Sequence, residues 1–151
     1  MDMIPPDDVI AAARAAERKW GIPAAISIAQ WALESGWGKH MPPGSNNPFG
    51  IKARPGEPSI TAPTREVIHG RPTIVEAPFR KFASLSEAFD RHGELLATAP
   101  AYARARAFEK APDAFADALT GIYATDPHYG SLLHAIMRGA DLYRYDAAAA
   151  S

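Results

Sequence analysis

The segment Ile22–Leu33 constrains the fold more than any other part of the sequence. It is apolar on every side of a helix, since Ser27 and Gln30 are its only polar residues. A helix that is hydrophobic all round has to be buried, so the segment predicts a buried helix. Pro23 suits the first helical turn, where its missing N–H costs no hydrogen bond, and Gly36 is a suitable terminator.

Glu34 follows this apolar segment directly. A carboxylate at the end of a buried helix is costly to ionise, so we expect its pKa to be raised. Such a group keeps a proton near neutral pH and donates it to a leaving oxygen, which is what a general acid does when a glycosidic bond is cleaved. The alternative is a helix-terminal glutamate whose side chain turns out to bulk solvent.

Composition excludes several other classes. The 151 residues are 47% hydrophobic and 22% charged, which predicts one globular domain over 1–151 with a short frayed tail at 147–151. A net charge of −1 offers no basic surface for nucleic acid. Cysteine is absent and the five histidines lack zinc-site spacing, so we expect no metal and no other cofactor. No apolar run approaches the ~20 residues of a membrane helix, and Met1–Asp8 does not resemble a Sec signal.

Helical patterns occupy both ends of the chain. Asp7 or Asp8 is expected to cap a first helix that runs to Trp20, before Gly21 ends it. A capping box at Ser84–Glu87 opens a later helix. The helices expected in this later part of the chain cover residues 84–99, 112–121 and 129–142.

The middle of the chain has a different character. Residues 40–63 are rich in proline, glycine and asparagine, which no helix accommodates. Two extended runs, 59–68 and 72–82, flank His69-Gly70 and predict a β-hairpin. The prolines within these runs place both strands at sheet edges. The sum is an α+β arrangement, a mainly helical domain that carries a small hairpin lobe.

Four sequence blocks carry a family resemblance. In chain order they are Ala32–Gly38 (ALESGWG), Ser45–Ala53 (SNNPFGIKA), Phe79–Phe82 (FRKF) and Tyr123–Tyr129 (YATDPHY). Together they resemble the glucosaminidase domain of glycoside hydrolase family 73. The resemblance implies a lysozyme-like fold in which a β-hairpin lobe flanks the active-site cleft. It also implies a hydrolase that cuts the β-1,4 bond between N-acetylglucosamine and N-acetylmuramic acid in peptidoglycan, an endo-β-N-acetylglucosaminidase.

By that resemblance Glu34 is the catalytic acid, and Tyr123 binds the acetamido group of the sugar or orients Glu34. The second carboxylate is expected on the hairpin, where Glu66 is preferred to Glu76 because it precedes the turn. Two mechanisms remain open: an inverting one, in which Glu66 activates water across ~6.5–9.5 Å, and one in which the acetamido group itself attacks the anomeric carbon. From spacing alone, Tyr123 also fits a half-buried core residue.

A second set of residues is predicted to bind the sugar. These residues are Gln30, Trp37, Asn46, Asn47, Phe49, Gly50 and Tyr129. Asparagine amides both donate and accept hydrogen bonds, which suits sugar hydroxyls, and tryptophan stacks on pyranose faces. Gln30 lies one helical turn before Glu34, where it also suits a supporting hydrogen bond. Turn formation by the asparagines and core packing by the tryptophan are the alternatives.

Other functions stay open at this point. The chain also fits a muramidase, a lytic transglycosylase or a non-catalytic wall-binding module. The expected partner is a peptidoglycan glycan strand, and the biological setting is a phage endolysin, a housekeeping autolysin or a type VI secretion effector. An effector would have an immunity protein that occupies the cleft. We expect a monomer, made in the cytoplasm without a Sec signal, that acts in the periplasm or on the cell wall. An effector would act on the wall of a target cell.

Overall fold

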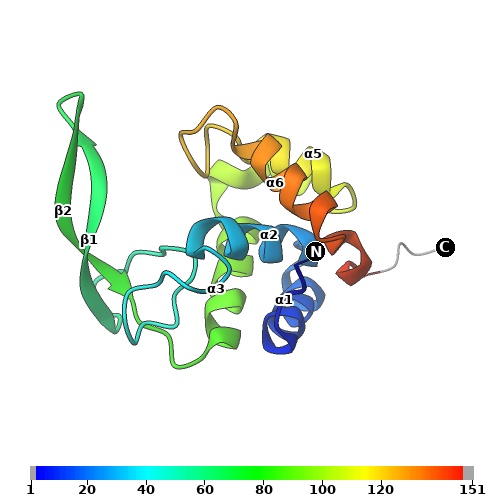
Figure 1. Cartoon of the computed structure of the whole chain (residues 1–151), viewed down its shortest axis with the longest axis horizontal. Helices are drawn as coiled ribbons and strands as arrows, with labels where there is room; N and C mark the ends of the chain where they lie inside the picture. The colour runs from blue at the N-terminus through cyan, green and yellow to red at the C-terminus, as the bar shows by residue number, and fades with distance from the viewer. Residues whose placement is uncertain (1–2, 148–151) are drawn as a thin grey trace.

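A helical body carries a β-hairpin that projects from one side (Figure 1). The computed structural model describes residues 3–147. The elements in chain order are α1 (Asp7–Trp20), α2 (Ala24–Ser35), β1 (Ser59–Ile68), β2 (Arg71–Arg80), α3 (Leu85–Thr98), η1 (Pro100–Tyr102), α4 (Ala103–Arg106), α5 (Pro112–Leu119), α6 (Tyr129–Gly139) and η2 (Leu142–Tyr145). The predicted α+β class is confirmed. The short η1 and α4 elements after Thr98 were not predicted.

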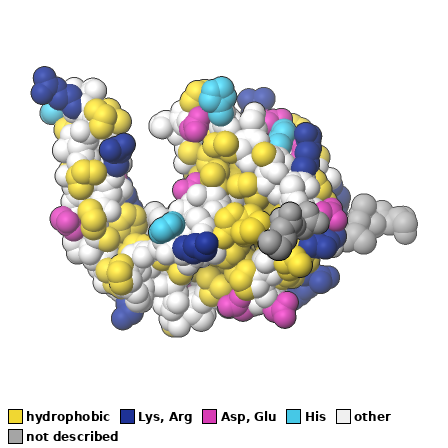
Figure 2. All heavy atoms as spheres, viewed as in Figure 1, with side chains coloured by type: hydrophobic (Ala, Val, Ile, Leu, Met, Phe, Trp, Pro, Cys, Tyr) yellow, Lys and Arg dark blue, Asp and Glu magenta, His cyan; other side chains and the backbone are white. Residues whose placement is uncertain are grey.

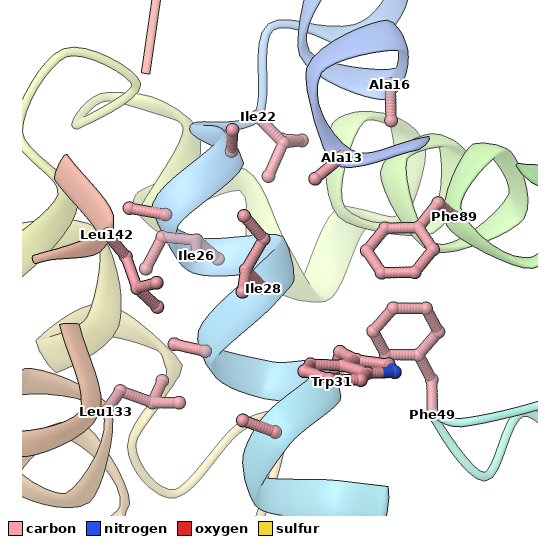
Figure 3. Packing of buried hydrophobic residues seen from close by; sticks show 14 of the residues in the cluster. Ala13, Ala16, Ile22, Ile26, Ile28, Trp31, Phe49, Phe89, Leu133 and Leu142 are labelled. Carbon is pink, nitrogen blue, oxygen red and sulfur yellow. The ribbon is translucent and has the colours of Figure 1, made fainter. Parts of the chain in front are cut away.

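Helix α2 is buried, as its sequence predicts, and it forms the centre of the body. It contacts α1, α3, α5, α6 and η2. Figure 3 shows Ile26 and Ile28 of α2 among side chains from the surrounding helices, including Phe89 and Leu133. These side chains have no exposed surface, and each buried side chain of this size contributes roughly 1.5–3 kcal/mol. The helix ends at Gly36, which has φ 56° and donates its N–H to the Ala32 carbonyl.

The other helix ends follow the predictions in part. Helix α1 ends at Gly21 as expected, but Pro6 stands at its N-cap position and makes no side-chain cap bond. The prediction that Asp7 or Asp8 caps the helix is therefore wrong; both lie in the first turn, where negative charge is favourable to the helix dipole. The N-cap role of Ser84 in α3 is confirmed, because Ser84 Oγ accepts the Glu87 N–H at 3.1 Å. The capping box is incomplete, since the Glu87 carboxylate accepts the N–H of Ala83 instead of that of Ser84.

The hairpin has a ten-residue antiparallel register that runs from Ser59 opposite Arg80 to Ile68 opposite Arg71. His69 and Gly70 form the turn with φ angles of 52° and 77°. Two successive positive φ angles define the type I′ turn, whose twist matches that of the strands it joins. Near its base the ribbon is bonded to the preceding loop, where the Ala53 N–H donates to Pro78 O, and nearer its tip Glu66 pairs with Lys52 of that loop.

The two ends of the described chain complete the fold. The expected tail at 147–151 lies outside the described residues except for Ala147, whose backbone N–H donates to the carboxylate of Glu17 at 3.0 Å. Within residues 3–147, none of the helices has the length and apolar character needed to cross a membrane. The single-domain organisation stays a prediction.

Candidate active site

A groove separates the hairpin from the helical body and is visible as the deep hollow in Figure 2. It consists of a larger cavity of about 720 Å³ and a smaller one of about 450 Å³. Glu34, Gly50 and Phe79 line both cavities. The Glu34 side chain therefore lies where the two cavities meet, with the hairpin across from it.

Glu34 stands in the last turn of α2, and its position at the helix end exposes it although the helix itself is buried. Its side chain opens onto the groove. The surrounding protein still removes enough water to raise the pKa of the carboxyl, and a hydrogen bond from Tyr129 offsets part of this increase. The expected direction of the pKa shift is confirmed, although part of the Glu34 side chain is exposed to the groove.

A chain of buried hydrogen bonds lies behind Glu34. The Tyr129 hydroxyl donates to Glu34 Oε1 at 3.0 Å, and Gln30 Nε2 donates to that hydroxyl at 2.9 Å. Gln30 Oε1 lies 2.7 Å from His92 Nε2. Because Gln30 uses its amide N–H groups toward Tyr129, its oxygen must accept, so His92 carries its proton on Nε2.

His92 is the buried end of this hydrogen-bond chain. It is completely buried, and burial lowers the pKa of its imidazole to about 3. A neutral imidazole with its proton on Nε2 donates to Gln30, Gln30 donates to Tyr129, and Tyr129 is left with Glu34 as its acceptor. The hydroxyl hydrogen therefore points at Oε1, so a proton on Glu34 belongs on the other oxygen.

Two residues predicted to bind sugar belong to this hydrogen-bond chain instead. Gln30 has no exposed surface and Tyr129 is only 2% exposed. Direct sugar contact by Gln30 is therefore ruled out by its burial, and the supporting bond expected of it reaches Glu34 through Tyr129. Tyr129 was predicted to contact the sugar, but in the structure its hydroxyl is bonded to Glu34.

Tyr123 does not bond to Glu34 as expected; Tyr129, six residues later in the same sequence block, makes that bond. The two tyrosine rings stack with their centroids 5.8 Å apart and an interplanar angle of 16°. Tyr123 also lines the larger cavity, and burial raises the pKa of its hydroxyl. A contact between Tyr123 and the sugar stays a prediction.

The loop after α2 is held by the two asparagines that were predicted to bind sugar. Asn47 is 1% exposed, and its amide Nδ2 donates to the carbonyls of Ile51 at 2.8 Å and Arg80 at 3.0 Å. Its oxygen accepts the Ile51 N–H at 3.1 Å. Asn46 has φ 50° and donates to Phe82 O at 3.1 Å. The alternative of turn formation therefore applies, and the Asn47 amide is fully used inside the protein.

Phe49 and Gly50 do reach the groove. The Phe49 ring stacks on His92 with centroids 4.1 Å apart, and its remaining surface lines the larger cavity. Gly50 has φ 65°, and no atom lies within 4 Å of the position that a Cβ would occupy. This leaves backbone accessible beside Glu34. Sugar contact by both residues stays a prediction.

Trp37 lies away from the groove. It follows Gly36 with a positive φ of 61°, which turns the chain back so that its ring packs edge-on against Trp31 at 5.6 Å. It lines a separate hollow together with Met3 and Ile136. The prediction that Trp37 stacks on a sugar in the groove is therefore wrong, and the alternative of packing applies.

The hairpin carboxylates differ in their surroundings. Glu66 Oε1 accepts a hydrogen bond from Lys52 Nζ at 2.6 Å, and Lys52 lines the larger cavity. Strand alternation places Glu66 on the same face as Thr64, which also lines that cavity. Glu76 is exposed and pairs with Pro63 on the opposite face of the ribbon. The geometry favours Glu66 over Glu76 as the second carboxylate, whose role stays a prediction.

Sequence reasoning missed the cationic residues of the larger cavity. They are Lys52, Arg54, Arg65 and Arg91. They come from the loop before β1, from β1 and from α3, so no local pattern brings them together. Only Lys52 lies in a sequence block that had already been singled out.

Comparison with known proteins finds one matching family and several bacterial relatives. The glucosaminidase family, described as mannosyl-glycoprotein endo-β-N-acetylglucosaminidase, matches residues 10–142. A probable N-acetylmuramidase of Lactococcus lactis is 33% identical over 96% of this chain, and exo-glucosaminidase LytG of Bacillus subtilis is 32% identical over 85%. The chain spans 35% and 48% of the lengths of these two relatives. The crystal structure of the catalytic domain of autolysin Auto from Listeria monocytogenes superposes with a TM-score of 0.83 at 29% identity, over 93% of this chain and 84% of that one.

Proposed function

Because the chain belongs to the glucosaminidase family, glycoside hydrolase family 73, we propose that it cleaves the β-1,4 bond between N-acetylglucosamine and N-acetylmuramic acid in peptidoglycan. Its lysozyme-like fold is the one expected of this family. The observation that carries the proposal is the position of Glu34, which lines both cavities of the groove and accepts a hydrogen bond from the buried Tyr129.

Glu34 is proposed as the general acid. Its raised pKa keeps a larger share of the carboxyl groups protonated at a given pH. A glycan strand in the groove displaces more water and favours the protonated form further. With Oε1 occupied by Tyr129, Oε2 donates the proton to the glycosidic oxygen. The bond from that oxygen to the anomeric carbon breaks, and positive charge develops on the sugar ring.

Two routes complete the reaction. In the inverting route Glu66 takes a proton from water while the water oxygen attacks the anomeric carbon from the opposite face. In the substrate-assisted route the acetamido oxygen attacks, and water then opens the resulting ring. The ion pair with Lys52 supports the inverting route, since it links Glu66 to a residue that lines the larger cavity.

The bond that is cut is tested by product analysis. Purified peptidoglycan is digested, reduced with borohydride and hydrolysed, and the reduced amino sugar is identified. The proposal predicts reduced glucosamine. The name of the Lactococcus lactis relative favours a second candidate, a muramidase, which would yield reduced muramic acid, while an anhydro product would identify a lytic transglycosylase. Either of the latter results would overturn the proposed bond, and release of single sugars would overturn endo cleavage.

The proposed setting is degradation of a bacterial cell wall, either by a type VI secretion effector or by a phage endolysin. Both roles require the same cleavage, and they differ in the neighbouring gene. A small protein that copurifies, occupies the groove and abolishes lysis supports the effector, whereas an adjacent holin gene supports the endolysin. A chromosomal neighbourhood with neither gene would contradict both and favour a housekeeping autolysin.

A further inference from the structure

The two cavities of the groove differ in charge. The larger one is lined by four cationic residues, Lys52, Arg54, Arg65 and Arg91, and Glu34 is the only acidic residue in its lining. The smaller one is lined mainly by proline and other apolar residues. Since clefts lined by charge of one sign concentrate ligands of the opposite sign, the larger cavity is suited to an anionic group.

Ion pairs within the protein neutralise only part of this charge. Lys52 pairs with Glu66, and Arg91 pairs with Glu94, each at 2.6 Å. Within residues 3–147, no ion pair involves Arg54 or Arg65. The cavity therefore retains positive charge, which is opposed by a single carboxyl whose raised pKa favours its neutral form.

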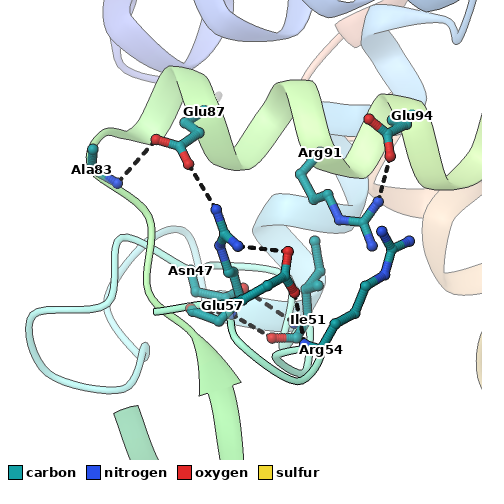
Figure 4. A network of polar contacts seen from close by, with 9 residues as sticks. Asn47, Ile51, Arg54, Glu57, Ala83, Glu87, Arg91 and Glu94 are labelled. Atoms are coloured by element: carbon teal, nitrogen blue, oxygen red, sulfur yellow. Dashed lines mark hydrogen bonds and ion pairs between the residues drawn. The ribbon is translucent and has the colours of Figure 1, made fainter. Parts of the chain in front are cut away.

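Arg54 is held by its backbone. Its N–H donates to Glu57 Oε1 at 2.7 Å, and the Glu57 N–H donates back to the Arg54 carbonyl at 3.0 Å. Glu57 is fixed in turn by an ion pair with Arg80 at 2.5 Å. Figure 4 shows the Arg54 side chain reaching from this turn toward Arg91 on α3. The loop therefore holds the base of Arg54 in place. Arg54 and Arg91 also border a smaller hollow lined by Glu57, Glu87, Asp90 and Glu94, but within residues 3–147 the Arg54 guanidinium makes no ion pair with these carboxylates.

Two guanidinium groups that line one cavity repel each other unless an anion lies between them. A carboxylate is the best complement, because guanidinium binds its two oxygens through parallel N–H···O bonds. In peptidoglycan, carboxylates are attached to the muramic acid unit, either on its peptide stem or, once the stem is removed, on its lactyl group.

Building on the proposed function, we propose that this cationic end of the groove binds a carboxylate carried by N-acetylmuramic acid. Arg54 and Arg91 are the primary contacts, and Lys52 adds charge from the loop before the hairpin, whereas strand alternation directs the Arg65 side chain to the outer face. The enzyme then selects charged wall glycan over a neutral glycan with the same backbone.

The test compares kcat/KM on three forms of one glycan. The first carries peptide stems, the second has had its stems removed by an amidase and exposes lactyl carboxylates, and the third is the second form with these carboxylates converted to methylamides. Wild type is expected to cleave the charged forms about tenfold faster than the neutral form, reflecting a charge-assisted hydrogen bond. Arg54→Glu is expected to lose about tenfold on charged glycan, mainly through KM, and to change less than twofold on the neutral form.

The controls separate this inference from its premise. Arg14→Glu reverses an exposed charge on α1, away from the groove lining, and is expected to match wild type. An Arg54 effect seen on the stem-bearing glycan and lost with the stems assigns the carboxylate to the peptide, and an effect on the stem-free glycan that amidation removes assigns it to the lactyl group; either supports the proposal. Equal rates of wild type on all three forms, or an equal loss by Arg54→Glu on all three, would overturn it. Failure of wild type to cleave any form would overturn the proposed function instead.

Discussion

The two walls of the groove present their carboxylates in opposite ways. On the helical wall, Glu34 ends a buried helix and is held through Tyr129, Gln30 and His92, all of which have almost no exposed surface. On the hairpin wall, Glu66 lies on a two-stranded ribbon and has one ion pair with a partly exposed lysine. The helical wall is fixed by the fold itself, whereas the hairpin wall depends on weaker local contacts.

The difference has an energetic basis. Each buried hydrogen bond behind Glu34 contributes about 0.5–1.5 kcal/mol and would leave unpaired polar groups if broken. An exposed ion pair such as Lys52–Glu66 contributes about 0–1 kcal/mol. Near the hairpin tip, Val67 is 72% exposed and Ile74 is 64% exposed, so the ribbon gains little from burial there. We infer that the acid is positioned before substrate binds and that the glycan itself completes the position of Glu66.

Glu34→Gln should have the largest effect. The variant keeps an oxygen that accepts the Tyr129 hydroxyl hydrogen but has no proton to donate, so we expect lysis of peptidoglycan to fall by ~10²-fold or more. The measurement is release of reducing ends from purified walls. Glu109→Gln changes an exposed carboxylate outside the groove and should match wild type. Full lysis by Glu34→Gln would contradict the assignment of Glu34 as the general acid.

Glu66→Gln should cost less, about 10- to 100-fold, if Glu66 activates water. Glu76→Gln is the matched control on the paired strand and should stay within twofold of wild type. The readout is kcat on soluble glycan, together with the anomeric configuration of the first product, which is inverted by the Glu66 route. A loss of less than threefold with retained configuration would favour attack by the acetamido group.

Tyr129→Phe should reduce kcat/KM about tenfold, because Glu34 loses its orienting bond. The hydrogen bond from Tyr129 lowers the pKa of Glu34, so its removal should raise that pKa. Activity that requires protonated Glu34 falls as pH rises through this pKa, so the alkaline limb of the pH profile should move to higher pH. A limb that stays in place or moves to lower pH would contradict the role given to Tyr129.

Asp146→Asn should affect stability alone. Asp146 Oδ1 accepts the Ala25 N–H at 2.8 Å at the start of α2, and burial raises the pKa of this carboxyl to about 6. The native state then binds more protons than the unfolded state between the ordinary pKa and 6, so wild-type stability falls as pH rises through this range.

The Asp146→Asn variant keeps the accepting oxygen and cannot ionise. Its free energy of unfolding should therefore be flatter with pH, and at pH 7.5 it should exceed the wild-type value by about 1 kcal/mol after allowance for partial solvent screening. Urea unfolding at several pH values measures this, with kcat on glycan expected to be unchanged. If the free energy of unfolding depended on pH equally in both proteins, the ionisation of Asp146 would not destabilise the native state.

Sequence reasoning succeeded where the pattern is local. The apolar segment around α2 and the His69-Gly70 turn depend on neighbouring residues, so their elements were predicted to within a few residues. Trp37 was misplaced because a positive φ at a non-glycine residue has no reliable local signal.

The parts of the site that were missed depend on contacts between distant residues. Glu34 and Tyr129 are 95 positions apart, and Gln30 and His92 are 62 apart. Spacing cannot distinguish Tyr123 from Tyr129, since both begin or end the same block. The meeting of Arg54 and Arg91 likewise needs the packing of α3 beside the loop before β1.

The most direct test of the account is a titration of the Glu34 carboxyl carbon by 13C NMR, with the signal assigned by its disappearance in Glu34→Gln. We predict that the pKa of the Glu34 carboxyl lies above the ordinary glutamate range and coincides with the pKa of the alkaline limb of the kcat/KM profile. A carboxyl that titrates at or below the ordinary glutamate range, or a limb that does not follow it, would contradict Glu34 as the acid.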